Sequence, residues 1–258
     1  MSSSDEESSE FVAGQVRAIV AQFLGTIGLR FEAIPFLERI HRLAALIALW
    51  GIRINLTAAP TDPCELAFHI IDSLAPFICC YELLCREFGP HSRVLDLGSG
   101  AGFPGLVLAS ASPANFTLVE NRRKRANFLT VAAAEMCLKN VLVEQRLLTQ
   151  AQSSFAVSSE HVIELSPAPS SLADMRRPWR AGFDVVTARA FAPAAAFHSA
   201  AGPTLRRGGV AIFYANPGQD LARNEAANAA LGDFRAVSYS IPRGRQMVQR
   251  VLGLWWGS

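Results

Sequence analysis

Four glycines follow a short apolar run in the segment VLDLGSGAGFPGLVLA, which spans residues 94–109. The apolar run ends in Asp96, and the glycines are Gly98, Gly100, Gly102 and Gly105. Glycines between a strand and a helix let the backbone approach a ligand, and the helix N-terminus adds free N–H groups. The sequence fits neither a P-loop, which needs Gly-Lys-Ser/Thr, nor a dinucleotide fingerprint, whose last glycine is replaced by Phe103. A carboxylate at Asp96 suits a cationic ligand better than a pyrophosphate.

A second acidic residue, Glu120, ends the next apolar run, residues 115–120. A carboxylate at the end of a second parallel strand can accept hydrogen bonds from both hydroxyls of a ribose. Pairing of Glu120 with Arg122 or Arg123 is the alternative interpretation. Together, the glycine loop and this strand-end acid resemble the first two cofactor-binding motifs of class I S-adenosylmethionine-dependent methyltransferases.

Four further polar residues are candidates to border a cleft: His69, Asp72, Ser73 and Arg189. His69 and Asp72 are three residues apart in the segment HIIDSL, which places them on one face of a helix. Arg189 follows the apolar run FDVVTA, and its guanidinium can bind a carboxylate or a phosphate through two parallel hydrogen bonds. The alternatives are a packing histidine at position 69 and a structural ion pair of Arg189 with Asp72 or Asp96.

The order of several short segments narrows the resemblance to one family. The segments NLT, HIIDSL, GSGAGFPG and TARAFAP occur in this order within residues 36–215, and they resemble the RsmG (GidB) family. The resemblance implies S-adenosyl-L-methionine as cofactor and methylation of guanine N7 in bacterial 16S small-subunit ribosomal RNA. The implied partner is this RNA, free or within a 30S-type subunit or its precursor.

The resemblance also assigns cofactor contacts residue by residue. The family's contacts fall on Gly98, Phe103, Leu147, Leu148 and Arg189, and the motif adds Asp96, Gly100, Gly102 and Glu120. The family commonly has an acidic residue where this chain has Leu148, so no carboxylate is available there for the adenine amine. The fifth predicted strand ends in Asn216 and Pro217 instead of the family's usual Leu-Lys-Gly.

The implied reaction needs no acid–base residue. Guanine N7 has a free lone pair and a sulfonium methyl is already electrophilic, so the protein has to align the two in line and exclude water. We therefore expect no essential catalytic acid or base, and no metal. The ARAFAP segment also lacks the Asn/Asp-Pro-Pro-aromatic loop of enzymes that methylate exocyclic amines.

Basic residues are concentrated in the second half of the chain. Residues 1–120 contain 7 Lys and Arg against 13 Asp and Glu, whereas residues 121–258 contain 17 against 9. This asymmetry favours a polyanionic partner. The candidate RNA-binding residues are Arg122, Arg123, Lys124, Arg125, Arg206, Arg207, Arg243 and Arg245. Ordinary solvated surface charge is the alternative for any one of them.

Two other functions remain open at this point. A class I methyltransferase acting on another RNA site or on a small molecule would keep the cofactor and change the partner. A non-catalytic RNA-binding protein with a methyltransferase fold would have lost the cofactor, and the departures at Leu148, Asn216 and Pro217 are the features that favour it.

The elements that must position these residues alternate between strands and helices after residue 90. Strands are predicted over 93–97, 115–120, 141–145, 183–188 and 209–214, with two more around 234–241 and 247–255; helices are predicted over 103–110, 122–138 and 193–205. This alternation predicts an α/β fold, the Rossmann-like class I methyltransferase fold with a doubly wound, mostly parallel sheet. Helical periodicity before residue 90 predicts a helical N-terminal extension.

The expected organisation is a disordered acidic tail (1–10), a helical extension (11–90) and the cofactor-binding domain (91–258) with a surface insertion (149–182). No apolar run approaches the roughly 18–20 residues that span a bilayer. The five cysteines fit neither paired zinc-site spacing nor a disulfide framework. We therefore expect a cytoplasmic monomer with reduced thiols and no membrane partner.

Overall fold

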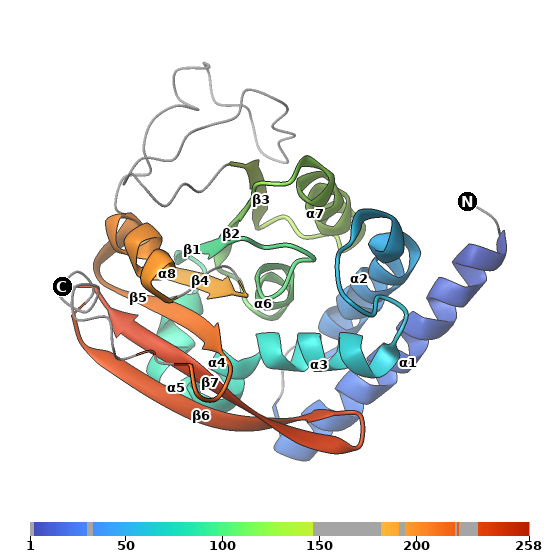
Figure 1. Ribbon diagram of the computed structural model, residues 1–258, viewed down its shortest axis with the longest axis horizontal. Coiled ribbons are helices and arrows are strands. Elements are labelled where there is room, and N and C mark those ends of the chain that lie inside the picture. Colours follow the sequence, from blue (N-terminus) through green and yellow to red (C-terminus); the bar gives the residue numbers. More distant parts are fainter. Residues whose placement is uncertain are drawn as a thin grey trace.

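The computed structural model describes residues 3–29, 33–146, 182–190, 194–219, 221 and 232–257. A seven-stranded sheet forms its centre, with helices on both faces (Figure 1). The strands are β1 (Arg93–Leu97), β2 (Asn115–Glu120), β3 (Val141–Gln145), β4 (Phe183–Arg189), β5 (Leu205–Ala215), β6 (Phe234–Arg243) and β7 (Gln246–Trp256). The α-helices are α1 (Ser3–Ile27), α2 (Ala33–Ile54), α3 (Pro63–Ser73), α4 (Ala75–Cys79), α5 (Tyr81–Leu84), α6 (Gly105–Ala111), α7 (Arg123–Glu135) and α8 (Ala194–Ala201), with 3-10 turns η1 (Cys85–Phe88) and η3 (Gly202–Thr204).

The strand order is β3-β2-β1-β4-β5-β7-β6, and all pairs from β3 to β5 are parallel. β7 lies antiparallel to both β5 and β6. The chain changes direction across the sheet between β1 and β4, so the crevice beyond the carboxyl ends of these strands is the ligand position for this topology. The predicted doubly wound, mostly parallel fold of a class I methyltransferase is confirmed.

The two faces of the sheet have separate apolar cores. On one face α6 and α7 pack on the strands, with α2 outside them, and this core includes Leu106, Leu118 and Phe128. On the other face α8 covers β1, β4 and β5 through a core that includes Phe197 and Phe213. Figure 1 shows α8 on one side of the sheet and α6, α7, α2 and α1 in succession on the other. This division follows from right-handed crossovers running in opposite directions from β1 and β4.

The expected disordered tail is wrong for residues 3–10, which form the first turns of α1. Acidic residues at a helix N-terminus interact favourably with the helix dipole, and α1 carries Asp5 and Glu6 there. Glu10 accepts a hydrogen bond from His41 of α2 at 2.8 Å, and Asp5 forms an ion pair with Arg53. The tail is therefore helical because α2 offers it partners. No helix among the described residues is long and apolar enough to cross a membrane.

Some helix and strand ends differ from the predicted ones. α7 ends at Glu135 instead of Leu138, and β5 begins at Leu205 instead of Gly209. Asp62 caps the N-terminus of α3, because its side chain accepts hydrogen bonds from the backbone N–H groups of Cys64 and Glu65. The side chain of Glu65 pairs with Arg243. Apart from Gly182, the predicted insertion at 149–182 lies outside the described residues.

Candidate functional site

The glycine loop between β1 and α6 lies at the switch point of the sheet. Gly98, Gly100 and Gly102 have φ angles of 71°, 56° and 92°, which L-residues with side chains rarely adopt. A Cβ at Gly102 would lie 2.5 Å from Leu106 Cδ1, so this glycine is needed for packing. A Cβ at Gly100 would meet only the Gly98 carbonyl oxygen, at 3.8 Å. Gly100 is therefore the point at which the loop borders open space.

Glu120, at the carboxyl end of β2, is hydrogen-bonded to the backbone of the glycine loop. Its Oε2 accepts a hydrogen bond from Gly100 N–H at 3.0 Å, and its Oε1 accepts one from Arg122 N–H at 2.9 Å. Glu120 therefore pairs with Arg122, one of the two partners of the alternative interpretation, through the backbone N–H group of that residue. Each carboxylate oxygen keeps further lone-pair capacity. The geometry thus leaves Glu120 able to accept additional hydrogen bonds beside the open side of Gly100.

Asp96 is buried beneath the glycine loop, with only 1% of its surface exposed. Its Oδ1 accepts a hydrogen bond from the Thr187 hydroxyl at 2.8 Å, and its Oδ2 accepts one from Gly105 N–H at 3.2 Å. Burial raises the pKa of this carboxyl to about 6, although its hydrogen bonds oppose the shift. In the structure the Asp96 carboxylate joins β1, β4 and the start of α6.

Phe103 and His69 lie against each other at the opposite side of the loop. Their ring centroids are 5.3 Å apart, and the guanidinium carbon of Arg189 lies 5.6 Å from the centroid of the Phe103 ring. Phe103 is buried, whereas His69 is half-buried. The structure thus brings together three predicted site residues from α3, the glycine loop and β4.

Arg189 is the last residue of β4, and its guanidinium turns toward α3. Nη1 donates a hydrogen bond to the His69 carbonyl oxygen at 3.0 Å, Nη2 contacts His69 Nδ1, and Nε lies 3.4 Å from Asp72 Oδ2. These contacts use three of the five N–H groups of the guanidinium, and the other two have no partner among the described residues. The predicted structural ion pair with Asp72 is present.

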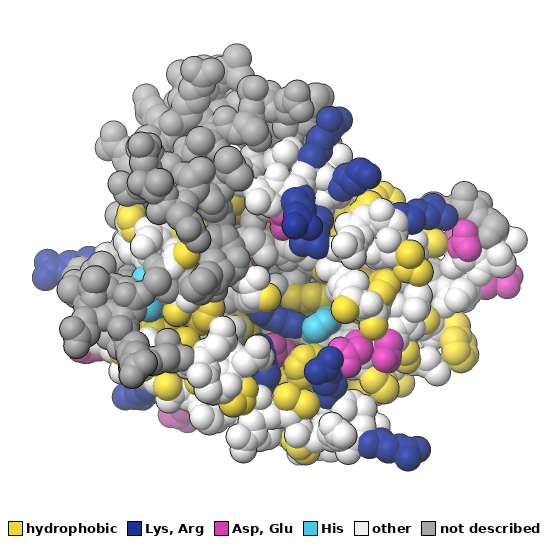
Figure 2. All heavy atoms as spheres, in the orientation of Figure 1, with side chains coloured by type: hydrophobic (Ala, Val, Ile, Leu, Met, Phe, Trp, Pro, Cys, Tyr) yellow, Lys and Arg dark blue, Asp and Glu magenta, His cyan; other side chains and the backbone are white. Residues whose placement is uncertain are grey.

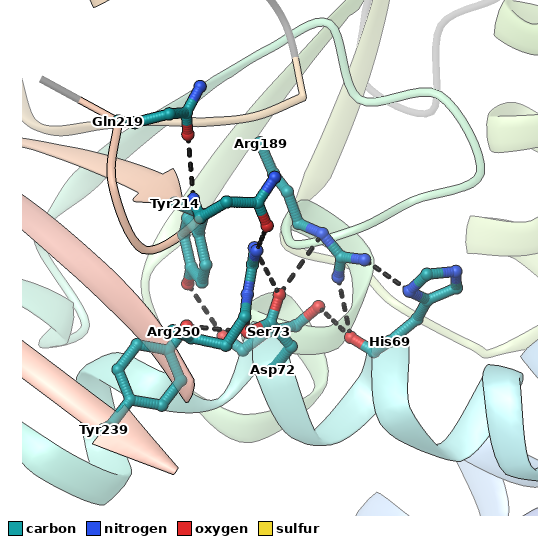
Figure 3. A network of polar contacts seen from close by, with 9 residues as sticks. His69, Asp72, Ser73, Arg189, Tyr214, Gln219, Tyr239 and Arg250 are labelled. Carbon is teal, nitrogen blue, oxygen red and sulfur yellow. Dashed lines mark hydrogen bonds and ion pairs between the residues drawn. The ribbon is translucent and has the colours of Figure 1, made fainter. Parts of the chain in front are cut away.

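Asp72 is the centre of a buried polar network, drawn in Figure 3. None of its surface is exposed, and its carboxylate accepts hydrogen bonds from the Tyr239 hydroxyl at 2.6 Å and from Arg250 Nε at 3.1 Å. A buried carboxylate requires partners of this kind, because desolvation otherwise costs several kcal/mol. The network, called the Asp72 network below, consists of His69, Asp72, Ser73, Arg189, Tyr214, Asn216, Tyr239 and Arg250.

The other members of the Asp72 network fix the backbone of α3. The Ser73 hydroxyl donates to the His69 carbonyl oxygen at 2.7 Å, and the Tyr214 hydroxyl donates to the Ser73 carbonyl oxygen at 2.8 Å. Arg250 also contacts Asn216 Oδ1, so the residue that replaces the family's usual lysine is part of this network. His69, Asp72 and Ser73 are therefore the residues of α3 in the network that holds Arg189 in place.

Sequence reasoning missed Arg250, Tyr239 and Tyr214. Arg250 is a charged residue inside the apolar C-terminal strand. A buried arginine needs an acidic partner, so its position in this strand was the available signal. Its partner, Asp72, lies 178 residues earlier in the chain. Only the return of the β6–β7 hairpin over α3 brings the two together.

Burial lowers the pKa of His69 and keeps its ring neutral even in mild acid. Its pKa falls to about 3, first because the ring is desolvated and then because Arg189, Arg243 and Arg250 repel a second positive charge. The ring is neutral at physiological pH. It therefore acts as a hydrogen-bonding group and does not serve as a proton acceptor there.

The predicted RNA-binding residues divide between the two edges of the sheet. Arg122, Arg123 and Lys124 are exposed at the start of α7, and Arg243 and Arg245 are exposed at the tip of the β6–β7 hairpin. Both positions lie beyond the carboxyl ends of the parallel strands. Figure 2 shows Lys and Arg side chains on either side of a hollow in this face. These five residues are called the basic rim.

Three predicted RNA-binding residues do not belong to the basic rim. Arg206 and Arg207 begin β5, and Leu205 pairs with Phe183 at the amino end of β4, which is the opposite edge of the sheet. Arg206 also forms ion pairs with Asp184 and Glu87. The half-buried Arg125 contacts the Asn55 carbonyl oxygen and ties α7 to the segment after α2.

Some predicted features lie outside the site or outside the described residues. Leu147 and Leu148 are not among the described residues. Four cysteines whose side chains are described are free thiols. Among the described residues, no three His, Cys, Asp or Glu side chains gather in a way that could hold a metal ion.

Comparison with known proteins gives a consistent family. The model of the GidB family, described as rRNA small subunit methyltransferase G, matches residues 36–160. The ribosomal RNA small subunit methyltransferase G of Ralstonia nicotianae is 34% identical over 225 residues, covering 86% of this chain and 89% of that protein. The protein of the same name from Acidiphilium cryptum is 36% identical over 193 residues, covering 73% and 72%.

Solved structures of other methyltransferases align more weakly. The O-methyltransferase from Bacillus cereus in complex with SAH has a TM-score of 0.48 and 16% identity, covering 83% of this chain and 90% of that one. The matched part of the family model, residues 36–160, includes the glycine loop. On this basis the chain belongs to the rRNA small subunit methyltransferase G family, a family of S-adenosylmethionine-dependent ribosomal RNA methyltransferases.

Proposed function

We propose that this protein transfers the methyl group of S-adenosylmethionine to N7 of a guanine in small-subunit ribosomal RNA. The family membership supports the cofactor and the class of RNA. The observation that supports N7 is the chemistry of the described site, whose side chains bind and orient but supply no general base. His69 has a pKa of about 3, Asp96 is buried beneath the loop, and Asp72 is engaged by two arginines.

The residues around the glycine loop fit the cofactor. Gly100 borders open space, so the backbone can lie against a nucleoside without a side chain between them. Glu120 keeps acceptor capacity for the ribose hydroxyls, and the two remaining N–H groups of Arg189 suit a carboxylate. When bound, S-adenosylmethionine supplies a methyl group on a positively charged sulfur.

The role of the protein in the reaction is to position groups. A guanine N7 lone pair needs no proton removed before it attacks, so alignment and exclusion of water account for the rate enhancement. The Asp72 network holds Arg189 from three sides, which fixes one wall of the site before substrate arrives. Preorganisation of this kind costs no rearrangement at the moment of reaction.

The basic rim is proposed to hold the RNA through its phosphates, on both sides of the hollow in Figure 2. Arg245 is exposed at the hairpin tip, and Arg207 is an exposed arginine at the opposite edge of the sheet. Removing one phosphate contact reduces the slope of log Kobs against log salt by about 0.7–0.9. Arg245→Ser is expected to produce this change in RNA binding, whereas Arg207→Ser is expected to leave the slope unaltered.

We further propose that the protein acts as a monomer in the cytoplasm, on small-subunit RNA or on a 30S-type particle or precursor. Sedimentation with and without such particles tests both the oligomeric state and the form of the substrate. Binding to the assembled particle alone would identify the particle as the substrate.

Calorimetric titration with S-adenosylmethionine tests the cofactor site. We expect micromolar binding to the wild-type protein and loss of binding in Gly100→Val, whose side chain would fill the open side of the loop. Gly208→Val is the matched control: Gly208 also has a positive φ and open surroundings, but it lies at the amino end of β5. Equal loss in both variants would attribute the effect to backbone strain, and absence of binding to the wild type would favour a non-catalytic RNA-binding protein.

A further inference from the structure

The tautomer of His69 is set by its neighbour. A guanidinium has only N–H donors, and Arg189 Nη2 contacts His69 Nδ1. Nδ1 must therefore be the accepting nitrogen of the neutral ring, which places the proton on Nε2. A second hydrogen bond, from Arg189 Nη1 to the His69 carbonyl oxygen at 3.0 Å, keeps the guanidinium and the ring in one arrangement.

Other residues of the Asp72 network hold Arg189 and His69 in this arrangement. Arg189 Nε lies 3.4 Å from Asp72 Oδ2, and Asp72 is held by Arg250 and Tyr239. The Ser73 hydroxyl donates to the same His69 carbonyl oxygen at 2.7 Å. The imidazole cannot exchange its donor and acceptor nitrogens without breaking the contact with Arg189. His69 Nε2–H is thus a hydrogen-bond donor of fixed position.

The donor points away from Arg189. In Figure 3 the second ring nitrogen of His69 is on the side of the ring opposite the guanidinium, and no dashed contact reaches it. The ring is half-buried and lies 5.3 Å from the ring of Phe103 in the glycine loop. No described residue accepts a hydrogen bond from Nε2. The site therefore presents one unused, fixed donor next to an aromatic ring.

Purine bases differ in what they offer to such a donor. Beside N7, guanine carries the acceptor O6, whereas adenine carries the donor group N6–H2. A fixed N–H group at this place accepts guanine and rejects adenine, because two donors would face each other without an acceptor. A donor on O6 also leaves the N7 lone pair free, which a donor on N7 itself would not.

We propose that His69 is a specificity-determining residue that donates its Nε2–H to O6 of the target guanine. The proposal rests on the N7 methyl transfer proposed above and adds the group that recognises the base. Arg189 and Asp72 act on recognition through His69, as positioning residues, by keeping the proton on Nε2.

The test compares purines that carry O6 with one that lacks it. Once the methylated position is mapped, small-subunit RNA is prepared by ligation with guanine, hypoxanthine or 2-aminopurine at that position. Hypoxanthine keeps O6 and lacks the 2-amino group, whereas 2-aminopurine lacks O6. Wild-type protein is expected to methylate guanine and hypoxanthine at similar rates, and 2-aminopurine about tenfold more slowly than either because one hydrogen bond is lost.

Two variants separate recognition from a general structural effect. In His69→Asn the side-chain amide can still accept from Arg189 but does not reach the position of Nε2, and in His69→Gln the longer amide can place an N–H group there. The ratio of the guanine rate to the 2-aminopurine rate is expected to collapse in His69→Asn and to be largely kept in His69→Gln. A merely structural role would lower both rates and leave the ratio unchanged.

The outcomes distinguish this proposal from the one it rests on. Methylation of guanine N7 with an unchanged ratio in His69→Asn overturns the recognition role alone. A wild-type protein that methylates no guanine N7 overturns the proposed function as well. Nitrogen-15 NMR of the His69 ring gives an independent result: a proton on Nδ1 in the free protein contradicts the fixed tautomer.

Discussion

The buried carboxyl of Asp96 provides a quantitative test of the glycine-loop geometry. Burial raises its pKa from 3.8 to about 6, so the ionised form is less favourable in the folded chain than in the unfolded chain. A carboxyl whose folded pKa is raised contributes most to stability below pH 3.8, and that contribution is lost as the pH rises through about 6. At pH 8 the ionised group lowers the free energy of unfolding by about 3 kcal/mol relative to a group that does not titrate.

Asp96→Asn is the perturbation that isolates this effect. The amide can keep both contacts, because its oxygen can accept from Gly105 N–H and its nitrogen can donate to the Thr187 hydroxyl. The variant is therefore expected to be more stable than the wild type by about 3 kcal/mol at pH 8, and by only about 1 kcal/mol near pH 4.5. The low pKa values of His69 and His198 lower stability in acid equally in both proteins, so they cancel in the difference.

Urea unfolding followed by tryptophan fluorescence at both pH values measures the difference. A difference that grows with pH supports the buried, ionisable carboxyl beneath the loop. A variant that is less stable than the wild type at pH 8, or a difference that does not change with pH, would refute the reasoning. Either result would mean that ionised Asp96 is stabilised by a charge that the described contacts do not include.

Three further perturbations test the packing around the site. Asp72→Asn leaves two buried guanidinium groups without their carboxylate, and urea unfolding is expected to show a loss of about 3–5 kcal/mol; a loss below 1 kcal/mol would contradict a central role for this side chain. Gly105→Ala places a Cβ 2.3 Å from Leu118 Cδ2 and is expected to lower the free energy of unfolding by about 1–3 kcal/mol. Gly14→Ala in α1, where a Cβ has no neighbour within 4 Å, is expected to raise it by about 0.5–1 kcal/mol. Thermal unfolding that ranks the two variants in the reverse order would refute the assigned packing. Among the described residues, neither ring nitrogen of the buried His198 has a hydrogen-bond partner. His198→Phe is therefore expected to raise stability at pH 7 by about 1–3 kcal/mol, and a decrease in the unfolding midpoint would show that these nitrogens are in fact paired.

Three strands of the parallel part of the sheet, β1, β2 and β3, could be predicted from sequence to the residue. β1 and β2 are short, mostly buried apolar runs, and burial on both faces of a parallel sheet produces this pattern. Helix ends were predicted less well, because the last turn depends on tertiary contacts that a local pattern does not contain. The first turns of α1 are the clearest case, since their acidic residues find basic partners on α2.

Sequence reasoning identified many residues of the candidate site but not what each of them does there. Sequence reasoning identified Asp96 but not its direction, because spacing does not tell whether a strand-end carboxylate points under a loop or out of it. Arg206 and Arg207 were included on charge alone, although residues that precede a parallel strand lie at its amino end, away from the ligand crevice. Arg250 reaches Asp72 across 178 residues, a contact that depends on the closing hairpin and leaves no local signal.

The measurement that tests the central claim most directly is identification of the methylated nucleoside. Small subunits from a strain that lacks this protein are incubated with the purified protein and methyl-labelled S-adenosylmethionine, and the RNA is then digested and analysed by mass spectrometry. The account predicts that the label appears in 7-methylguanosine, at one position of the small-subunit RNA. Label in any other nucleoside, or no label in RNA at all, would contradict it.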